Sequence, residues 1–215
     1  MSQFTVQKQQ VIDACLTLAE SGYLAGTGGN LSLRLSNELF AVTPSGADYY
    51  SLRADDICVL RLVNLEQVEG NLKPSVESAM HATMLRHKPA MQASVHTHQP
   101  MASAIALLNI ELPVQSDADQ LALGERVAIV PYAPSGTVFL VHRFKQCLRD
   151  NVQAYLLKNH GVICAAKTMA EAIDSVGRIE AIAADFLRQH IDASANLSPM
   201  LRALSLSALR ESVAT

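Results

Sequence analysis

Residues 93–100 read Ala93-Ser94-Val95-His96-Thr97-His98-Gln99-Pro100, a run with small and β-branched residues that ends in a proline. This pattern predicts a short strand that stops at Pro100, because proline cannot donate a ladder hydrogen bond. Alternate residues of a strand face the same side, so His96 and His98 would direct two imidazoles to one point. Imidazole is a common ligand for zinc and related divalent metals. The alternative is that both are half-buried polar residues of an ordinary strand.

Two further stretches, one on each side, supply the other ligands that a metal site needs. Upstream lies Lys73-Pro74-Ser75-Val76-Glu77, and downstream lies Lys158-Asn159-His160-Gly161. Glu77 and His160 fall at the expected ends of elements, where functional residues collect. Together with the His-x-His pair they give three histidines and one carboxylate, enough to hold a catalytic metal. Glu77 also has a purely structural explanation, because a carboxylate in the first turn of a helix complements the helix dipole.

The length of 215 residues fits one α/β domain with a sizeable core. We expect a single domain over residues 1–215, with its core at about 5–190 and a tail over 191–215. Hydrophobic residues make up 49% of the chain and charged residues 17%, which argues against disorder and favours an oligomer. The net charge is −3 and there is no long basic run, so no nucleic-acid partner is expected.

The four cysteines indicate a reducing compartment. Cys15, Cys58, Cys147 and Cys164 are far apart, each lies in an apolar stretch, and no Cys-x-x-Cys motif occurs. We interpret them as reduced core residues of a cytoplasmic protein. The first five residues do not begin a signal-peptide-like apolar run, and no apolar run is long enough to cross a membrane, so no membrane partner is expected.

The residues before the His-x-His stretch predict one helix followed by several strands. Apolar residues recur at helical spacing in the first of these segments and alternate with polar residues in the next. We expect a helix over 5–22, strands over 31–35, 38–42 and 57–62, and a hairpin turn at 69–71.

A second helix is expected over about 75–88. Ser75 would be its N-cap, and Glu77 would fall in its first turn. The two histidines of this helix, His81 and His87, are expected on its solvent face.

The residues after the His-x-His stretch continue the α/β pattern. The expected elements are helices over 100–108, 138–149 and 169–190, and strands over 127–130, 154–157 and 162–165. Residues 111–125 give no clear assignment. His142 is expected to be solvated, and His160 falls at a tight turn between the last two strands. Beyond Ile191 the chain is rich in Ser and Ala, which predicts a loosely packed tail.

Two loops near the first strands could bind an anion. Gly26-Thr27-Gly28-Gly29-Asn30 is rich in glycine, so its backbone could approach a phosphate closely. It could equally be a plain turn, and it is not a Walker loop because no Gly-Lys-Ser/Thr follows. Thr43-Pro44-Ser45-Gly46 offers hydroxyls and a free glycine amide.

Five short motifs follow one another along the chain. They are Gly28-Gly29-Asn30-Leu31-Ser32, Thr43-Pro44-Ser45-Gly46, Lys73-Pro74-Ser75-Val76-Glu77, Val95-His96-Thr97-His98 and Asn159-His160-Gly161. In this order they resemble the motifs of the class II aldolase/adducin family, over about residues 5–190. The resemblance implies an α/β fold with three layers, α/β/α, around a largely antiparallel central sheet.

The resemblance also implies a site. A zinc ion, or another divalent metal, would be held by His96, His98 and His160, with Glu77 as a further metal ligand or as the catalytic base. The residues that match the family's substrate-phosphate positions are Gly29, Asn30, Ser45, Gly46 and Ser75. Many members are cyclic homotetramers with active sites between subunits, which implies a homotetramer here.

The implied reaction agrees with these residue types. Aldol cleavage of a ketose phosphate leaves a carbanion-like enediolate, and a divalent metal would stabilise that charge as a Lewis acid. Glu77 could move the proton. Backbone amides, short hydroxyls and a helix N-terminus at Ser75 would suit a phosphate dianion.

The sequence departs from the family pattern at two places. Family aldolases often have Pro-Ser-Ser-Glu, whereas Val76 replaces the second serine here, so one phosphate hydroxyl is missing. Family aldolases also use tyrosines as proton donors. A gap-free count from His96 places Asp117 at one such position, and no tyrosine follows Tyr155. Asp117 or Asp119 could supply the proton, or could simply be solvated on a loop.

Three functions remain open on these observations. The first is a metal-dependent lyase of the aldolase type that cleaves a small sugar phosphate or a related hydroxy-carbonyl compound. The second keeps the metal but dehydrates a ketose phosphate or decarboxylates an oxo acid. The third is a non-catalytic assembly domain, as in adducin, and the complete set of three histidines and Glu77 argues against it.

Overall fold

The strands of the chain form the centre of the molecule. The computed structural model describes residues 2–24, 26, 28–193, 199, 203, 206 and 207. The strands are β1 (Asn30–Arg34), β2 (Leu39–Val42), β3 (Cys58–Arg61), β4 (Gln67–Glu69), β5 (Ala93–Thr97), β6 (Leu112–Pro113), β7 (Arg126–Val130), β8 (Ala154–Leu157) and β9 (Gly161–Ala166). Within the described residues they join into one nine-stranded sheet in the order β4-β3-β2-β1-β5-β9-β8-β7-β6.

The sheet is largely antiparallel. Each strand runs antiparallel to its neighbour from β4 through to β8, and β6 is antiparallel to β7. Among the described strands, only β7 and β8 pair in parallel.

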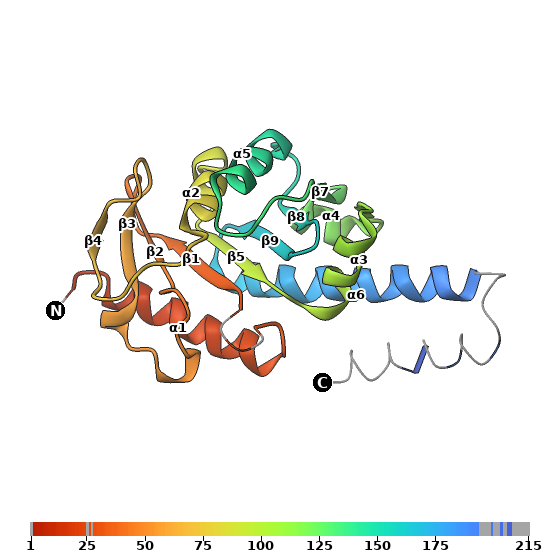
Figure 1. The fold of residues 1–215 in the computed structure, drawn as a ribbon, viewed down its shortest axis with the longest axis horizontal. Helices are drawn as coiled ribbons and strands as arrows, with labels where there is room; N and C mark the ends of the chain where they lie inside the picture. Colours follow the sequence, from red (N-terminus) through yellow and green to blue (C-terminus); the bar gives the residue numbers. More distant parts are fainter. Residues whose placement is uncertain are drawn as a thin grey trace.

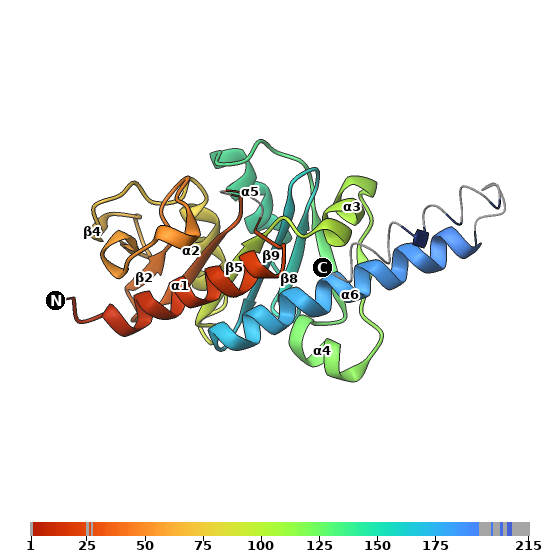
Figure 2. The ribbon, with the colours of Figure 1, turned by 90° about the horizontal axis from the view of Figure 1, so that it is seen from below.

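Helices cover both faces of this sheet. They are α1 (Thr5–Glu20), α2 (Ser78–His87), α3 (Pro100–Leu108), α4 (Asp117–Leu123), α5 (Val138–Cys147) and α6 (Met169–Ala193). Helices α1, α3 and α6 pack on one face, and α2 and α5 pack on the other (Figures 1 and 2). The predicted three-layer α/β/α fold with a largely antiparallel sheet is therefore confirmed. None of the helices in the described part is long and apolar enough to span a bilayer.

The two helical layers enclose separate cores. On one face, Val11, Ile105 and Ile179 from α1, α3 and α6 meet the sheet. On the other, Met84 of α2 and Phe144 of α5 do so. Every residue of β5, β8 and β9 is buried as a result, which matches the nearly continuous apolar sequences of β8 and β9. His96 is thus carried by a strand with little freedom to move.

Several loops meet at one end of the sheet because its strands alternate in direction. β1 and β9 begin at this end, and β2, β5 and β8 finish there. β7 also finishes there, since it runs parallel to β8. The motifs that precede or follow these strand ends are therefore neighbours in space, although they lie far apart in sequence.

Two predictions about the middle of the chain are wrong. The hairpin turn is not at 69–71 but between β3 and β4, where the Leu65 N–H donates to the Arg61 carbonyl at 2.9 Å. Helix α2 begins at Ser78 rather than at Ser75. The residues before it are held extended by a bridge between Pro44 and Pro74, in which the Ser75 N–H donates to the Thr43 carbonyl.

The prediction that His81 faces solvent is also wrong, because its exposed fraction is 0%. His87 and His142 are exposed, as expected. The unassigned stretch 111–125 contains β6 and α4, and Ser116 caps α4 by accepting the Asp119 N–H. The last long helix continues to Ala193, past its predicted end. Most of the predicted tail, from residue 194 onward, lies outside the described residues.

Candidate metal centre

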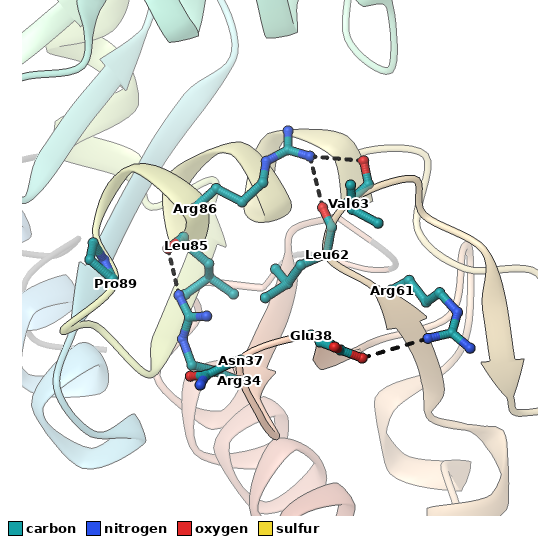
Figure 3. Close-up of a pocket in the computed structure, with 9 residues that line it drawn as sticks. All are labelled: Arg34, Asn37, Glu38, Arg61, Leu62, Val63, Leu85, Arg86 and Pro89. Atoms are coloured by element: carbon teal, nitrogen blue, oxygen red, sulfur yellow. Dashed lines mark hydrogen bonds and ion pairs between the residues drawn. The ribbon is translucent and has the colours of Figure 1, made fainter.

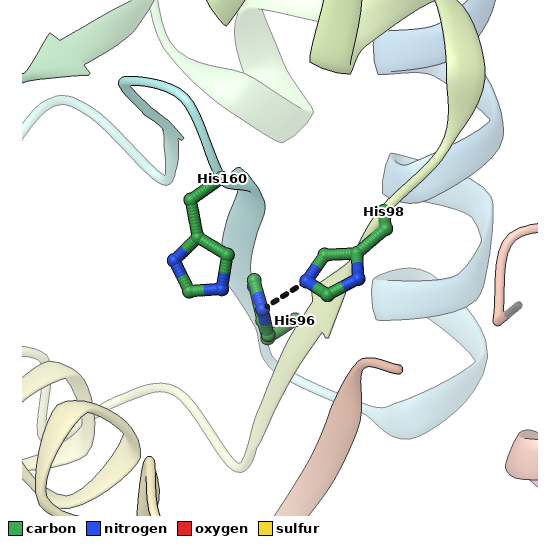
Figure 4. A group of neighbouring side chains, drawn as sticks. All are labelled: His96, His98 and His160. Carbon is green, nitrogen blue, oxygen red and sulfur yellow. Dashed lines mark hydrogen bonds between the residues drawn. The ribbon is translucent and has the colours of Figure 1, made fainter. Parts of the chain in front are cut away.

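Three histidines converge at the end of the sheet where these loops meet. His96 lies in β5, His98 follows that strand directly, and His160 lies in the turn between β8 and β9. Their rings point toward one another in Figure 4, and one ring nitrogen of each lies within 4.8 Å of the others. The two Nε2 atoms of His96 and His98 are 3.0 Å apart. The structure thus brings together the three predicted histidines.

The turn that carries His160 requires unusual backbone geometry. Asn159 has a φ of 57°, in the left-handed region that asparagine tolerates better than most residues. Gly161 follows, and a Cβ there would lie 2.6 Å from the His98 ring and against the Thr97 carbonyl oxygen. The Asn-His-Gly sequence is therefore needed both for the turn and for the close approach of β5.

The donor set fits a divalent metal. The His96 Nδ1–H donates to the Val162 carbonyl at 2.7 Å, which leaves the Nε2 lone pair directed at the other rings. Burial lowers the pKa of His96 to about 3 and also lowers the pKa of His98 and of His160. All three rings are therefore neutral near pH 7, the state in which imidazole binds a metal. The Nδ1 atom of His160 has no hydrogen-bond partner among the described residues.

Glu77 closes the open side of the histidine cluster. Its Oε2 lies 3.2 Å from His96 Nε2, and its Oε1 lies 3.2 Å from His160 Nε2. Each oxygen also accepts a side-chain hydrogen bond of 2.8 Å, Oε2 from the Asn30 amide and Oε1 from the Ser135 hydroxyl. The side chain is only 5% exposed. Glu77 is thus held on both oxygens and faces the same point as the rings.

The surroundings of Glu77 favour its ionised form. Burial alone would raise the pKa of its carboxyl group, but the His96 and His160 rings and the hydrogen bonds from Asn30 and Ser135 lower it below its usual range. Because burial keeps those rings neutral near pH 7, the two hydrogen bonds are the interactions that hold the charge there.

A cavity of about 170 Å³ opens beside this cluster. It is lined by Gly28, Gly29, Asn30, Pro44, Ser45, Gly46, Ser75, Val76, Glu77, His98, Ser135 and His160. All five predicted phosphate-binding residues are among them. Among the residues that the structure describes, no lysine or arginine lines this cavity, so its anion-binding groups would be backbone amides and hydroxyls.

The loops that form the cavity are fixed to one another. The isolated Pro44–Pro74 bridge joins the segments that carry Ser45 and Ser75, and the Ser45 N–H donates to the Lys73 carbonyl at 2.9 Å. Gly29 has a φ of 81°, and the Tyr49 hydroxyl donates to its carbonyl at 2.7 Å. The glycine-rich segment is therefore held in place at the described residues.

Two residues of the site escaped sequence analysis. Ser135 lies in the loop after β7, and only its position in a polar loop at a strand end could have drawn attention to it. His81 was placed on the wrong face of its helix. Conversely, neither Asp117 nor Asp119 lines the cavity, and Asp119 pairs with Arg178 at 2.7 Å.

A larger cavity, of about 620 Å³, lies at the opposite ends of β1 and α2 (Figure 3). Arg34 and Arg86 contribute to its wall, but their guanidinium groups donate to backbone carbonyls. Arg34 binds the carbonyls of Leu85 and Met91, and Arg86 binds that of Leu62. Both guanidinium groups therefore provide hydrogen bonds to backbone carbonyls at the ends of loops and of α2. None of the candidate site residues lines this cavity.

Comparisons with known proteins agree with this geometry. Residues 9–187 match the family described as Class II Aldolase and Adducin N-terminal domain. The chain is 35% identical over 175 residues to a 5-deoxy-D-ribulose 1-phosphate aldolase of Bacillus thuringiensis serovar kurstaki, covering 81% of each chain. It is 31% identical over 172 residues to an L-fuculose phosphate aldolase of Methanococcus maripaludis, covering 80% of this chain and 91% of the relative. A solved L-fuculose 1-phosphate aldolase superposes with a TM-score of 0.80 at 28% identity, covering 98% of both chains.

Proposed function

The chain belongs to the class II aldolase and adducin family, and on that premise we propose that it is a metal-dependent aldolase that cleaves a small sugar phosphate. The observation that carries the proposal is the convergence of His96, His98 and His160 on Glu77 beside a cavity lined by serines and glycines. A non-catalytic assembly domain would not need three neutral histidines and an ionised carboxylate directed at one point.

The metal would be held by the three histidines, with Glu77 as a further ligand or as the base. When bound, a divalent metal supplies Lewis-acid stabilisation of the negative charge that develops on the substrate oxygens during cleavage. Zinc suits a site with three imidazole ligands. The hydrogen bond from His96 Nδ1 to the Val162 carbonyl orients that ring and keeps its Nε2 free for the metal.

Glu77 is the base that we assign to the reaction. Aldol cleavage removes the proton of the substrate hydroxyl that becomes the aldehyde oxygen, and it adds a proton to the carbon that keeps the electron pair of the broken C–C bond. An ionised carboxylate within reach can accept the first proton and return a proton to that carbon. Within the described part of the chain, Glu77 is the one carboxylate that lines the cavity. The hydrogen bonds from Asn30 and Ser135 orient its two oxygens, and the side chain is only 5% exposed.

The substrate phosphate would lie against Gly29, Asn30, Ser45, Gly46 and Ser75. One relative is named as an aldolase of 5-deoxy-D-ribulose 1-phosphate, and the solved structure is named as an aldolase of L-fuculose 1-phosphate. Both compounds are ketose 1-phosphates, so we propose the same class of substrate here. Val76 lines this cavity in place of a hydroxyl residue and is 56% exposed. The chain therefore has one hydroxyl fewer for the phosphate than the common family motif.

We also propose a homotetramer in a reducing compartment such as the cytoplasm. The four cysteines are free thiols, and three of them are buried. Light scattering on the purified protein would measure the number of chains per particle, and a monomeric mass would contradict this part of the proposal.

The test of function is a product assay with a panel of ketose 1-phosphates, including 5-deoxyribulose and fuculose 1-phosphate. Wild type should release dihydroxyacetone phosphate and an aldehyde. Glu77→Gln should keep its fold and slow turnover by about 10²–10⁴-fold, the usual contribution of a general base. Release of carbon dioxide, or loss of water without C–C cleavage, would instead favour the decarboxylase or dehydratase reactions of the family. Turnover of Glu77→Gln at the wild-type rate would remove Glu77 from the role of base.

A further inference from the structure

A buried chain of hydrogen bonds runs from the interior of the protein to Glu77. His81 belongs to α2 and lies one turn after Glu77, the residue that precedes this helix. The side chain of His81 is completely buried. Both of its ring nitrogens have partners: Nε2 lies 2.6 Å from the Asn30 side-chain oxygen, and Nδ1 lies 2.8 Å from the Ser94 hydroxyl. Asn30 in turn donates to Glu77. Four side chains from three different elements are thus linked in a row.

The direction of each hydrogen bond in this chain follows from its end at Glu77. An ionised carboxylate can only accept, so Asn30 must present its NH₂ group to Glu77. Its carbonyl oxygen then faces His81 and must accept a hydrogen bond from the Nε2–H group. With Nε2 protonated and the ring neutral, Nδ1 can only accept, and the Ser94 hydroxyl donates a hydrogen bond to it. Burial lowers the pKa of His81 to about 4, which agrees with a neutral ring.

We propose that His81 is a positioning residue for the active site, which acts on Glu77 through Asn30. This inference rests on the proposed role of Glu77 in metal binding and catalysis. The physical reason is that the oxygen and the NH₂ group of an asparagine side chain have nearly the same shape, so they can exchange places by rotation. Without a donor at His81, the Asn30 side chain could turn over and direct its oxygen at the Glu77 carboxylate, where it would repel the charge instead of stabilising it. A donor fixed inside the protein excludes that arrangement.

The surroundings of His81 distinguish this role from simple packing. Its neighbours along α2, from Met80 to Leu85, are buried too, so a hydrophobic side chain would fill the space. A buried polar chain instead requires that every member be satisfied, and here every member is. The other oxygen of Glu77 is held independently by Ser135, from the loop after β7. Loss of His81 should therefore misorient one oxygen of the carboxylate and leave the other in place.

The test compares His81→Leu, which fills the site without a donor, with His81→Gln, which can still donate an N–H to Asn30. Zinc affinity is measured for each by competition with a chelator, and kcat and KM are measured on the substrate that wild type cleaves. Groups that hydrogen-bond to a metal ligand typically contribute about 10–100-fold in affinity or activity, and His81 fixes the orientation of such a group, Asn30. We expect a loss in this range for His81→Leu, expressed in zinc affinity and kcat more than in KM, and recovery of most of it in His81→Gln.

Two further measurements keep the inference testable if His81→Leu does not fold. Nitrogen NMR of the metal-free wild type should find the His81 ring neutral and protonated on Nε2. Ser94→Ala, which removes the partner of Nδ1, should weaken zinc binding in the same direction by a smaller factor. A ring protonated on Nδ1, or equal losses in His81→Gln and His81→Leu, would overturn the inference. A wild-type protein without aldolase activity would instead contradict the proposed function, and the zinc affinities would still test the role of His81.

Discussion

Ser135 illustrates how much of this site depends on single hydrogen bonds. Its hydroxyl donates to Glu77 Oε1 at 2.8 Å, in an environment where the carboxylate has little contact with water. A hydrogen bond to a charged group contributes about 1.5–3 kcal/mol, so Ser135→Ala should lower kcat by roughly 10–100-fold while the fold is retained.

Ser135→Thr is the matched control, because it keeps the hydroxyl group. Steady-state kinetics on the two variants should separate them, with Thr close to wild type and Ala well below it. Equal activity of Ser135→Ala and wild type would mean that the second oxygen of Glu77 needs no partner.

The sequence correctly predicted that His96, His98 and His160, the proposed metal ligands, lie together, but it missed His81. His98 comes two residues after His96, directly after the end of β5, and the alternation of an extended chain places both on one face. The environment of His81 depends on tertiary contacts instead. Helix α2 is packed between the sheet and α5, so almost every side of it is buried, and helical periodicity could not identify a solvent face.

Among the elements, the turn between β8 and β9 has the strictest steric requirement. Gly161→Ala would place a methyl group against the Thr97 carbonyl oxygen and the His98 ring. We expect β5 and β9 to separate at this end, with loss of zinc binding and a melting temperature several degrees lower.

Gly177→Ala in α6 is the control for that substitution, because a Cβ there meets nothing within 4 Å. Alanine is the better helix former by about 1 kcal/mol, so this variant should melt at the wild-type temperature or above and bind zinc normally. Full zinc binding by Gly161→Ala would contradict the close packing of the turn.

The boundaries of the elements were predictable where local chemistry decides them. Helix α3 begins at Pro100 and ends at Leu108, as predicted, because proline is favoured in the first turn and ends the preceding strand. The start of α2 was not predictable in this way. The bridge between Pro44 and Pro74 keeps the chain extended before Ser78, and no local pattern reveals a partner that lies 30 positions away.

For the whole molecule, the buried histidines predict how stability depends on pH in the metal-free protein. The pKa of His81 falls from its usual 6.5 to about 4 in the folded state, through burial. Between these values the unfolded chain binds a proton that the folded chain does not. The resulting stability is present above pH 6.5 and is lost as the pH falls toward 4, by about 3 kcal/mol in all.

Urea unfolding of the chelator-treated protein at several pH values between 7 and 4 would measure this dependence. His96 acts in the same direction, since its pKa is lowered to about 3. His98 and His160, whose pKa values are also lowered, add to the same dependence. His81→Gln removes only the contribution of His81, so its stability should fall less steeply than that of wild type. Identical slopes for the two proteins would mean that His81 is not buried as a neutral ring.

The central claim is that the three histidines form a metal centre, and metal content per chain tests it most directly. Plasma mass spectrometry would be applied to wild type, to His98→Ala and to His142→Ala, whose histidine is exposed on α5. If the three imidazoles bind a metal, wild type and His142→Ala should each contain about one zinc, or another divalent ion, per chain. His98→Ala should contain almost none. Wild type without metal after zinc is added back, or His98→Ala with the same content as wild type, would contradict the account.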